Sequence, residues 1–352
     1  MEGLLISMMA PETDDRDKKV HGRSMDGSIQ PREVDSSIYV VIPVFNRVAL
    51  TRNCLKRMER VVWPGNLVIV VVDDGSTDGT DQMLAKEFPE VTVIRGDGTL
   101  WWTGAMALAI EELTPRFGDD DYVLCLNNDT LIEPDTLQIL VDASRQYNGA
   151  MVSPMARETN GAVLETGAQI GWGFRTSVGY SGESHEHKNS NGDIEAEVIF
   201  GRATLIPVQL FRKIGNFRPD QFPQYFGDSD FSLRAKRAGV PQILVGRAEV
   251  RCVNDENTTG LHIEERGTVN LKSAWQMLTN RRSNYNLYYA NKFVWMYAPL
   301  GLKVIGVARV NYLCLSRVIK PLILPPHRRR RIKSIVKRLI GHSSDSKSVD
   351  GK

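Results

Sequence analysis

The run YVLCLNND, from Tyr122 to Asp129, is the most informative part of this sequence. Its first five residues are apolar and predict a buried strand, which the polar tripeptide Asn127-Asn128-Asp129 closes. A carboxylate that follows a buried strand at a turn lies at the C-terminal edge of a sheet, where open α/β folds bind ligands. There Asp129 can hold Mg²⁺ or Mn²⁺ together with phosphate oxygens and water. The structural alternative is an Asx turn that caps the next helix.

Outward from this run, apolar strands and amphipathic helices alternate along the chain. The strand at 38–45 is apolar and β-branched on both faces, as in a buried parallel strand, and Asn46 is positioned to cap the helix after it. This alternation predicts a parallel sheet with helices on both faces, a nucleotide-binding type of α/β unit. Further strands are expected at 67–72, 91–94 and 199–206, and further helices at 80–88, 103–113, 134–147 and 231–238.

Two further acidic turns lie before and after Asp129. Asp74, in the turn after the strand at 67–72, can accept a hydrogen bond from a base N–H or a ribose hydroxyl, and Gly75 lets the backbone approach the ligand. Asp228 lies at a helix start, where the macrodipole favours its ionised form, and it can deprotonate a hydroxyl. An ordinary turn and a helix N-cap are the alternatives, and Asp230 is expected to be an N-cap. Three acidic turns in this order favour a functional site.

Charge is distributed unevenly over the 352 residues, although the net charge is only +2. Between Glu265 and Asp345 the sequence carries sixteen Lys and Arg residues and no acidic residue. This composition predicts a negatively charged partner, such as an anionic membrane surface or a nucleic acid. The four cysteines are far apart and form no CxxC pair, which indicates reduced core residues and a reducing cytosol rather than disulfides or zinc ligands.

The motifs occur in four segments, VIPVFN (Val41–Asn46), VVVDDGSTD (Val70–Asp78), LCLNND (Leu124–Asp129) and YFGDSDFSLR (Tyr225–Arg234). In this order and spacing they resemble the family 2 glycosyltransferases of the GT-A fold, the Rossmann-like fold of nucleotide-diphospho-sugar transferases. The resemblance covers about residues 38–245. It implies an α/β fold with a mostly parallel central sheet and a C-terminal helical extension.

Membership of that family implies transfer of a sugar from a nucleotide-diphosphate donor to a hydroxyl acceptor, with inversion at the anomeric carbon. In-line attack needs one base and a stabilised leaving group. By position, the resemblance assigns the nucleotide base to Pro43, Phe45 and Asp74, the ribose to Asn128, the metal (Mg²⁺ or Mn²⁺) to Asp129, and the general base to Asp228.

The chain departs from the family pattern in three places. The usual DxD motif has Asn127 instead of its first carboxylate, and the usual Glu-Asp pair reads Gly227-Asp228. The metal- or phosphate-contacting histidine that family members often carry after the base helix has no clear counterpart, and Asp255 and His262 are the candidates. These departures leave open a catalytically degenerate scaffold protein that binds a sugar nucleotide.

Two tryptophans, Trp101 and Trp102, precede a helix start that is rich in small residues. They can wall a sugar or nucleotide pocket while the helix N-terminus faces phosphate, and core packing is the alternative. The segment GTLWWTGAM (Gly98–Met106) is similar to the subgroup that includes bacterial rhamnosyltransferases. That similarity makes dTDP-L-rhamnose a candidate donor.

The C-terminal region is expected to be helical and basic. Lys303, Arg309, Arg317 and Lys320 fall on one arc of a helix in the apolar segment 293–326, and burying such charges costs about 2.5–3.5 kcal/mol each, which argues against a transmembrane span. A second helix, at 332–340, has one apolar and one basic face. This pattern predicts helices that lie on an anionic membrane, and a solvated helix packed on the catalytic domain is the alternative. Nucleic-acid binding is disfavoured because no nucleic-acid-binding motif accompanies the charge.

The sequence therefore divides into a disordered leader (1–36), a GT-A domain (37–262) and a basic amphipathic helical region (263–352). A nucleotidyltransferase would carry a Gly-rich basic loop after the first strand and a dehydrogenase a GxGxxG motif, and Pro43–Asn46 contains neither. The expected activity is metal-dependent, inverting hexosyl transfer to a saccharide or lipid-linked acceptor, in surface polysaccharide or glycoconjugate synthesis. The enzyme is expected to lie on the cytoplasmic face of the membrane.

Overall fold

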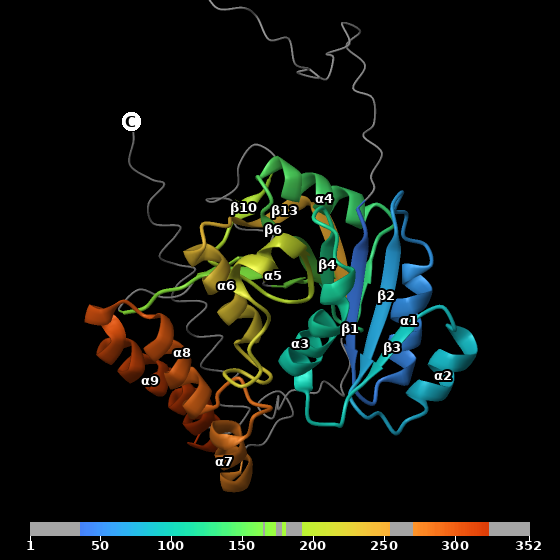
Figure 1. The fold of residues 1–352 in the computed structure, drawn as a ribbon. Helices are drawn as coiled ribbons and strands as arrows, with labels where there is room; N and C mark the ends of the chain where they lie inside the picture. The colour runs from blue at the N-terminus through green and yellow to red at the C-terminus, as the bar shows by residue number, and fades with distance from the viewer. Residues whose placement is uncertain (1–35, 165, 174–177, 181–191, 254–269, 324–352) are drawn as a thin grey trace, which may run out of the picture. The chain divides into compact units, whose positions relative to one another are not determined.

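The described residues form a ten-stranded mixed sheet with helices packed on it (Figure 1). The computed structural model describes residues 36–164, 166–173, 178–180, 192–253 and 270–323, which belong to one compact unit. The sheet order is β10-β13-β6-β12-β4-β1-β2-β3, with β5 paired to β13 and β7 to β6. The strands of this sheet are β1 Ile38–Val44, β2 Leu67–Asp73, β3 Thr92–Arg95, β4 Tyr122–Leu126, β5 Thr130–Ile132, β6 Met151–Glu158, β7 Val163–Leu164, β10 Ile194–Glu195, β12 Ala203–Pro207 and β13 Gln242–Cys252.

The first half of the sheet is parallel, as the alternating pattern predicted. Strand β1 pairs in parallel with β2 and β4, so that Ile38 lies opposite both Leu67 and Tyr122. The second half is mixed because β12 runs antiparallel to β4 and β6. Since β1, β2 and β4 run in one direction, the residues that follow them meet at one edge, and these residues carry the sequence motifs.

Helices cover both faces of the sheet (Figure 1). Along β1, Val40 and Ile42 pack in the core layer that contains α1, α2 and α4, whereas Tyr39 and Val41 pack in the layer that contains α3, α5 and α6. Strand side chains alternate between faces, so a strand with two covered faces must be apolar throughout. The helices are α1 Val48–Met58, α2 Thr80–Glu87, α3 Trp101–Leu113, α4 Thr136–Gln146, α5 Val208–Ile214 and α6 Gly227–Arg237.

Two expectations about local structure are wrong. The segment 199–206 is two strands rather than one, because β11 (Val198–Ile199) belongs to a separate three-stranded sheet and β12 begins only at Ala203. Asn46 does not cap α1. Its backbone is left-handed (φ 51°), and its side chain accepts a hydrogen bond from Thr77 N at 2.7 Å, while the Val48 N–H donates to Asp78.

Within the described residues, three α-helices follow the sheet: α7 Leu271–Thr279, α8 Leu287–Tyr297 and α9 Lys303–Ile323. Helix α8 packs through Phe293 against Phe222 and Phe226, which precede α6. The three-stranded sheet of β8 (Gly167–Gln169), β9 (Val178–Tyr180) and β11 lies beside this cluster. The helical character expected for the basic region is thus present in 270–323, and the expected helix at 332–340 and residues 1–35 of the leader lie outside the described residues.

All four cysteines are buried and free, as predicted. Among the helices that the structure describes, none is long and apolar enough to cross a membrane.

Candidate active site

A pocket of about 640 Å³ opens at the sheet edge where β1, β2 and β4 end. The turn after β4, the start of α3 and the start of α6 complete its wall, and the loop before α8 adds Arg282 and Asn284. Eight of the site residues proposed from the sequence line this pocket: Pro43, Phe45, Asp74, Trp101, Trp102, Asn128, Asp129 and Asp228.

The turn after β4 is held from both sides. The Asn127 N–H donates to the Arg202 carbonyl at 3.0 Å, and the Asn127 side chain accepts from Trp102 Nε1 at 2.9 Å. Asn128 is buried and donates to the Thr51 hydroxyl. The turn leads into β5 rather than into a helix, so the helix-capping alternative does not apply. This bonding leaves the carboxylate of Asp129 facing the pocket.

Asp129 forms an ion pair that the sequence did not reveal. Arg47 Nη1 lies 3.2 Å from Asp129 Oδ2 and 3.2 Å from Asn128 Oδ1. Arg47 is almost buried, with 9% of its side chain exposed, whereas Asp129 is 26% exposed. The only feature of the sequence that pointed to Arg47 was its position directly after the motif Val41–Asn46. The pair holds the Asp129 carboxylate in place.

The donor set at Asp129 fits one kind of metal site. In the described part of the chain, no cluster of three or more His, Cys, Asp or Glu side chains is arranged to hold an ion. A single carboxylate suffices for Mg²⁺ or Mn²⁺ when phosphate oxygens and water complete the coordination, and the open side of Asp129 allows this. Asp255 and His262, the other candidates, lie outside the described residues.

Asp74 organises the loop before α3. Its Oδ1 accepts hydrogen bonds from the N–H groups of Gly98 (2.8 Å) and Leu100 (3.2 Å), and its Oδ2 accepts from that of Trp101 (3.0 Å). Trp101 has a left-handed backbone (φ 61°), which is costly for a bulky residue and is held here by the carboxylate. Asp74 lines the pocket with three acceptor sites already used, so its contact with a nucleotide base stays a prediction.

The amino end of α3 does not offer its N–H groups to a phosphate, contrary to the sequence-based expectation. The N–H of Trp101 donates to Asp74, that of Trp102 to Gln224 Oε1 at 3.0 Å, and that of Thr103 to the Pro223 carbonyl. The two tryptophans nevertheless line the pocket, and the guanidinium of Arg282 lies 4.8 Å from the Trp101 ring centre. Because Arg282 lies 181 positions further along the chain, local motifs carried no signal for it.

Asp228 lies in the first turn of α6 with its carboxylate at the pocket wall. Its Oδ2 accepts from Gly201 N at 3.2 Å, and its Oδ1 accepts from Ser229 N at 2.7 Å. Burial raises the pKa of this carboxyl above its usual value, although these hydrogen bonds and the charge of Arg202 oppose the shift. A partly buried carboxylate with a raised pKa is suited to accept a proton.

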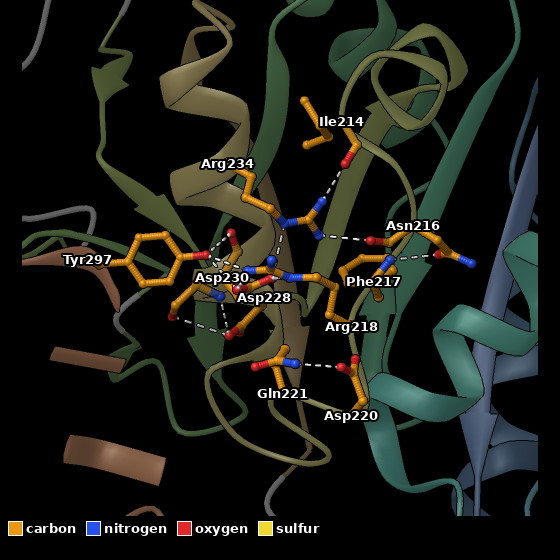
Figure 2. Close-up of polar contacts among 11 residues, drawn as sticks. Ile214, Asn216, Phe217, Arg218, Asp220, Gln221, Asp228, Asp230, Arg234 and Tyr297 are labelled. Atoms are coloured by element: carbon orange, nitrogen blue, oxygen red, sulfur yellow. Dashed lines mark hydrogen bonds and ion pairs between the residues drawn. The ribbon is translucent and has the colours of Figure 1, made fainter. Parts of the chain in front are cut away.

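The second aspartate of α6, Asp230, is not the helix N-cap that the sequence suggested. Phe226 holds the N-cap position, and Asp230 is buried in an ion-pair cluster with Arg218 and Arg234. The Tyr297 hydroxyl donates to Asp230 at 2.5 Å, which joins α8 to α6. Figure 2 shows this cluster next to Asp228. The two carboxylates therefore differ in role: Asp228 faces the pocket, and Asp230 ties elements together.

Comparison with known proteins identifies the family to which this site belongs. The family profile described as Glycosyl transferase family 2 matches residues 39–215, about half of the chain. The N-acetylglucosaminyl-diphospho-decaprenol L-rhamnosyltransferase from two strains of Mycobacterium tuberculosis is 24% identical over 319 residues, which cover 84% of this chain and 98% of the relative.

Two solved structures share the fold. A mannosyltransferase from Pyrobaculum calidifontis in complex with GDP-Man and Mn²⁺ has a TM-score of 0.50 and 18% identity, over 81% of this chain and 73% of that one. GalNAc-T7 with UDP, GalNAc and Mn²⁺ also has a TM-score of 0.50, with 12% identity, and the match covers 79% of this chain but only 54% of that protein. The architecture is therefore that of the GT-A glycosyltransferases, and the chain belongs to glycosyl transferase family 2.

Proposed function

We propose that this glycosyltransferase is an inverting enzyme that moves a sugar from a nucleotide-diphosphate donor to a hydroxyl of a lipid-linked saccharide. The observation that carries the proposal is the meeting of Asp129, Asp228 and the strand-end residues Pro43 and Phe45 in one pocket. The named activity of the mycobacterial relative supports a lipid-diphosphate-linked acceptor and, together with the Trp101-Trp102 segment, dTDP-L-rhamnose as the donor. Surface polysaccharide or glycoconjugate synthesis fits such a reaction.

In the proposed reaction, the partly buried carboxylate of Asp228 accepts the proton of the acceptor hydroxyl. The acceptor oxygen bonds to the anomeric carbon, the bond from that carbon to the diphosphate oxygen breaks on the opposite face, and the nucleoside diphosphate leaves with the electron pair. This in-line geometry inverts the anomeric centre. The raised pKa of Asp228 strengthens it as a base relative to an ordinary aspartate.

We propose that Asp129 holds Mg²⁺ or Mn²⁺ when the donor is bound. When bound there, such an ion would supply positive charge to the leaving diphosphate. The protein's contribution is the fixed position of the carboxylate, which the ion pair with Arg47 and the buried Asn128 provide. Mn²⁺ in both solved structures supports a divalent ion at this edge of the fold.

Nucleotide binding is the first test. UDP, dTDP and GDP should be compared as thermal stabilisers, each with and without Mn²⁺ or Mg²⁺, and one of them is expected to give a metal-dependent rise in Tm. At a ligand concentration of 100 times Kd the expected stabilisation is about 2.7 kcal/mol. Asp129→Asn should remove the metal-dependent part, while Asp135→Asn, an exposed aspartate outside the pocket, should not. No shift with any nucleotide would favour a degenerate scaffold or an unrelated ligand.

We further propose that the enzyme lies on the inner face of the membrane through α7, α8 and α9. Of the eleven exposed large apolar side chains among the described residues, ten lie between Leu271 and Ile319, and the other is Val62. Four of the five on α9 form a stripe away from the buried Cys314 and Val318, and Leu313 lies apart from it. The stripe consists of Val304, Tyr312, Leu315 and Ile319.

The charge of this region supports an anionic membrane as the occupant of this surface. Residues 270–323 contain eight Lys and Arg and no acidic residue, and Lys303 lies 5.2 Å from the ring centre of the exposed Trp295. Exposed aromatics beside cations are typical of the interface of an anionic leaflet. The reduced cysteines support the cytoplasmic side.

Vesicle co-sedimentation tests this surface. The wild type is expected to bind vesicles that contain an anionic lipid, and the double variant Trp275→Ser/Trp295→Ser should bind about tenfold or more weakly, since each loses an interfacial ring. Val62→Ser, which removes the exposed apolar side chain elsewhere, is the control and should bind normally. Unchanged vesicle binding of the double variant would contradict the proposal. So would a finding that the wild type self-associates through this surface and that the double variant loses this self-association but not vesicle binding.

A further inference from the structure

Arg202 differs from the other arginines of the pocket wall because it forms neither an ion pair nor a ring contact among the described residues. Arg47 is paired with Asp129, and Arg282 lies over the ring of Trp101. Arg202 also lines the pocket, yet it forms no ion pair with any residue that the structure describes. Its charge opposes the rise in the pKa of Asp228, but no carboxylate among the described residues lies within ion-pair distance, so the guanidinium is available to a ligand.

The surroundings of the Arg202 guanidinium are poor in acceptors. Its Nε is buried without a hydrogen-bond partner, and Nη1 faces Cys252 Sγ at 3.9 Å. A thiol sulfur is a weak acceptor, so most of the donors of this guanidinium remain unused within the described structure. Burying part of a cation without a partner is costly, and proteins retain such groups where a ligand supplies the opposite charge.

Backbone hydrogen bonds hold Arg202 between Asp129 and Asp228. Its carbonyl accepts the hydrogen bond from Asn127 N at the turn that carries Asp129, and its own N–H donates to the Phe200 carbonyl at 2.7 Å. The preceding N–H, of Gly201, donates to Asp228. Arg202 is thus anchored at the point where the leaving diphosphate of the proposed reaction must lie, between the metal-binding carboxylate and the base.

We propose that Arg202 anchors a diphosphate subsite in this pocket, an inference that rests on the proposed function for its location but not for its chemistry. The planar fork of a guanidinium matches two phosphate oxygens at once, and such charge-assisted pairs are stronger than neutral hydrogen bonds. The site has lost the first carboxylate of the family's metal motif to Asn127. Arg202 supplies positive charge to the diphosphate from the protein itself.

Two substrates of the proposed reaction carry this chemistry: the nucleotide donor and the lipid-linked acceptor. Calorimetric titration of wild type, Arg202→Gln and Arg202→Lys separates them. The titrants are dTDP, UDP and GDP, the matching monophosphates, inorganic pyrophosphate and geranyl diphosphate. Arg251→Gln is the matched control, because Arg251 is 66% exposed, lies next to Cys252 in sequence and is absent from the pocket wall.

Arg202→Gln is expected to weaken binding of a diphosphate by about ten- to a hundredfold, while the matching monophosphate changes by less than about threefold. Arg202→Lys should keep part of the preference, since the charge remains. Loss with a nucleoside diphosphate identifies the donor, and loss with geranyl diphosphate identifies the acceptor. Equal weakening of mono- and diphosphates, no weakening of any diphosphate, or the same effect in Arg251→Gln would overturn the proposal.

Failure of this inference and failure of the proposed function give different results. If no nucleotide binds wild type but pyrophosphate or geranyl diphosphate binds in an Arg202-dependent way, the subsite stands and the nucleotide-sugar function falls. If nucleotides bind and sugar transfer proceeds equally well in Arg202→Gln, the function stands and the subsite falls. Thermal unfolding of each variant in the absence of ligand shows whether an affected variant is folded.

Discussion

Asp228→Asn is expected to lower kcat by about 10²- to 10⁴-fold, the range that a positioned general base contributes. Asparagine keeps the size of the side chain and one acceptor oxygen, which can serve Ser229 N or Gly201 N but not both, and it cannot take the proton of the acceptor hydroxyl. Donor affinity should stay within a few fold of wild type, because the variant leaves Asp129 and Arg47 unchanged. Sugar transfer and nucleotide titration on the same preparation check both expectations. Wild-type turnover in Asp228→Asn would contradict the assignment, and binding without turnover in the wild type itself would favour the scaffold.

The raised pKa of Asp228 also fixes a pH dependence. Only the ionised carboxylate accepts a proton, so kcat/KM should fall as pH drops through this pKa, at a higher pH than for an ordinary aspartate.

The free energy of unfolding depends on pH in the opposite direction: the contribution of Asp228 falls as pH rises. Since the folded-state pKa lies above the unfolded one, the stability that protonation supplies is fully present below the unfolded pKa and is lost as pH rises through the folded pKa. Asp228→Asn is therefore expected to remove this pH-dependent part of the stability while it lowers kcat, and Tm measured across the pH range checks it. A variant that keeps the wild-type fall of Tm with rising pH would contradict the raised pKa of Asp228.

The sheet edge could be predicted from the sequence because its determinants are local. Tyr122–Leu126 is apolar on both faces and ends in a polar turn, and the structure has β4 at those same residues. Once the strands were parallel, topology alone brought their C-terminal ends together. The common pocket of Pro43, Asp74 and Asp129 could therefore be predicted without any knowledge of side-chain contacts.

The contacts between distant segments could not be predicted in this way. Arg47 pairs with Asp129 across 82 positions, and Arg282 reaches Trp101 from the helical region. Such contacts leave no periodic signal, because a single residue on a loop carries them. Asp74 shows the same limit: its position was predicted, but its three hydrogen bonds to the loop at 98–101 depend on how that loop folds back over β2.

The largest effect on stability is expected from Asp230→Ala, at about 3–5 kcal/mol of unfolding free energy. Asp230 is 1% exposed and accepts hydrogen bonds from Arg218, Arg234 and Tyr297. Removing it leaves two guanidinium groups together without their carboxylate, and Arg234 is only 13% exposed. Urea unfolding of the variant measures the loss. Asp120→Ala is the control, because Asp120 is exposed and takes no part in the cluster. Asp220, which Figure 2 shows beside Gln221, is unsuitable because its charge acts on Arg218.

Two variants of this cluster separate the effect of the Asp230 charge on stability from the effect of the contact between α8 and α6. Tyr297→Phe removes one hydroxyl from Asp230 and should cost about 1 kcal/mol, while both ion pairs remain. Hydrogen exchange then locates the loss. If Asp230 joins α8 to α6, backbone amides of α8 should exchange faster in Asp230→Ala, and to a smaller extent in Tyr297→Phe. If only α6 loses protection, the cluster stabilises that helix alone, and α8 is held by the packing of Phe293 on Phe222 and Phe226. Because Asp228 stands two residues from Asp230 in the same helix, faster exchange in α6 should be accompanied by lower kcat, whereas loosening of α8 alone should not change it.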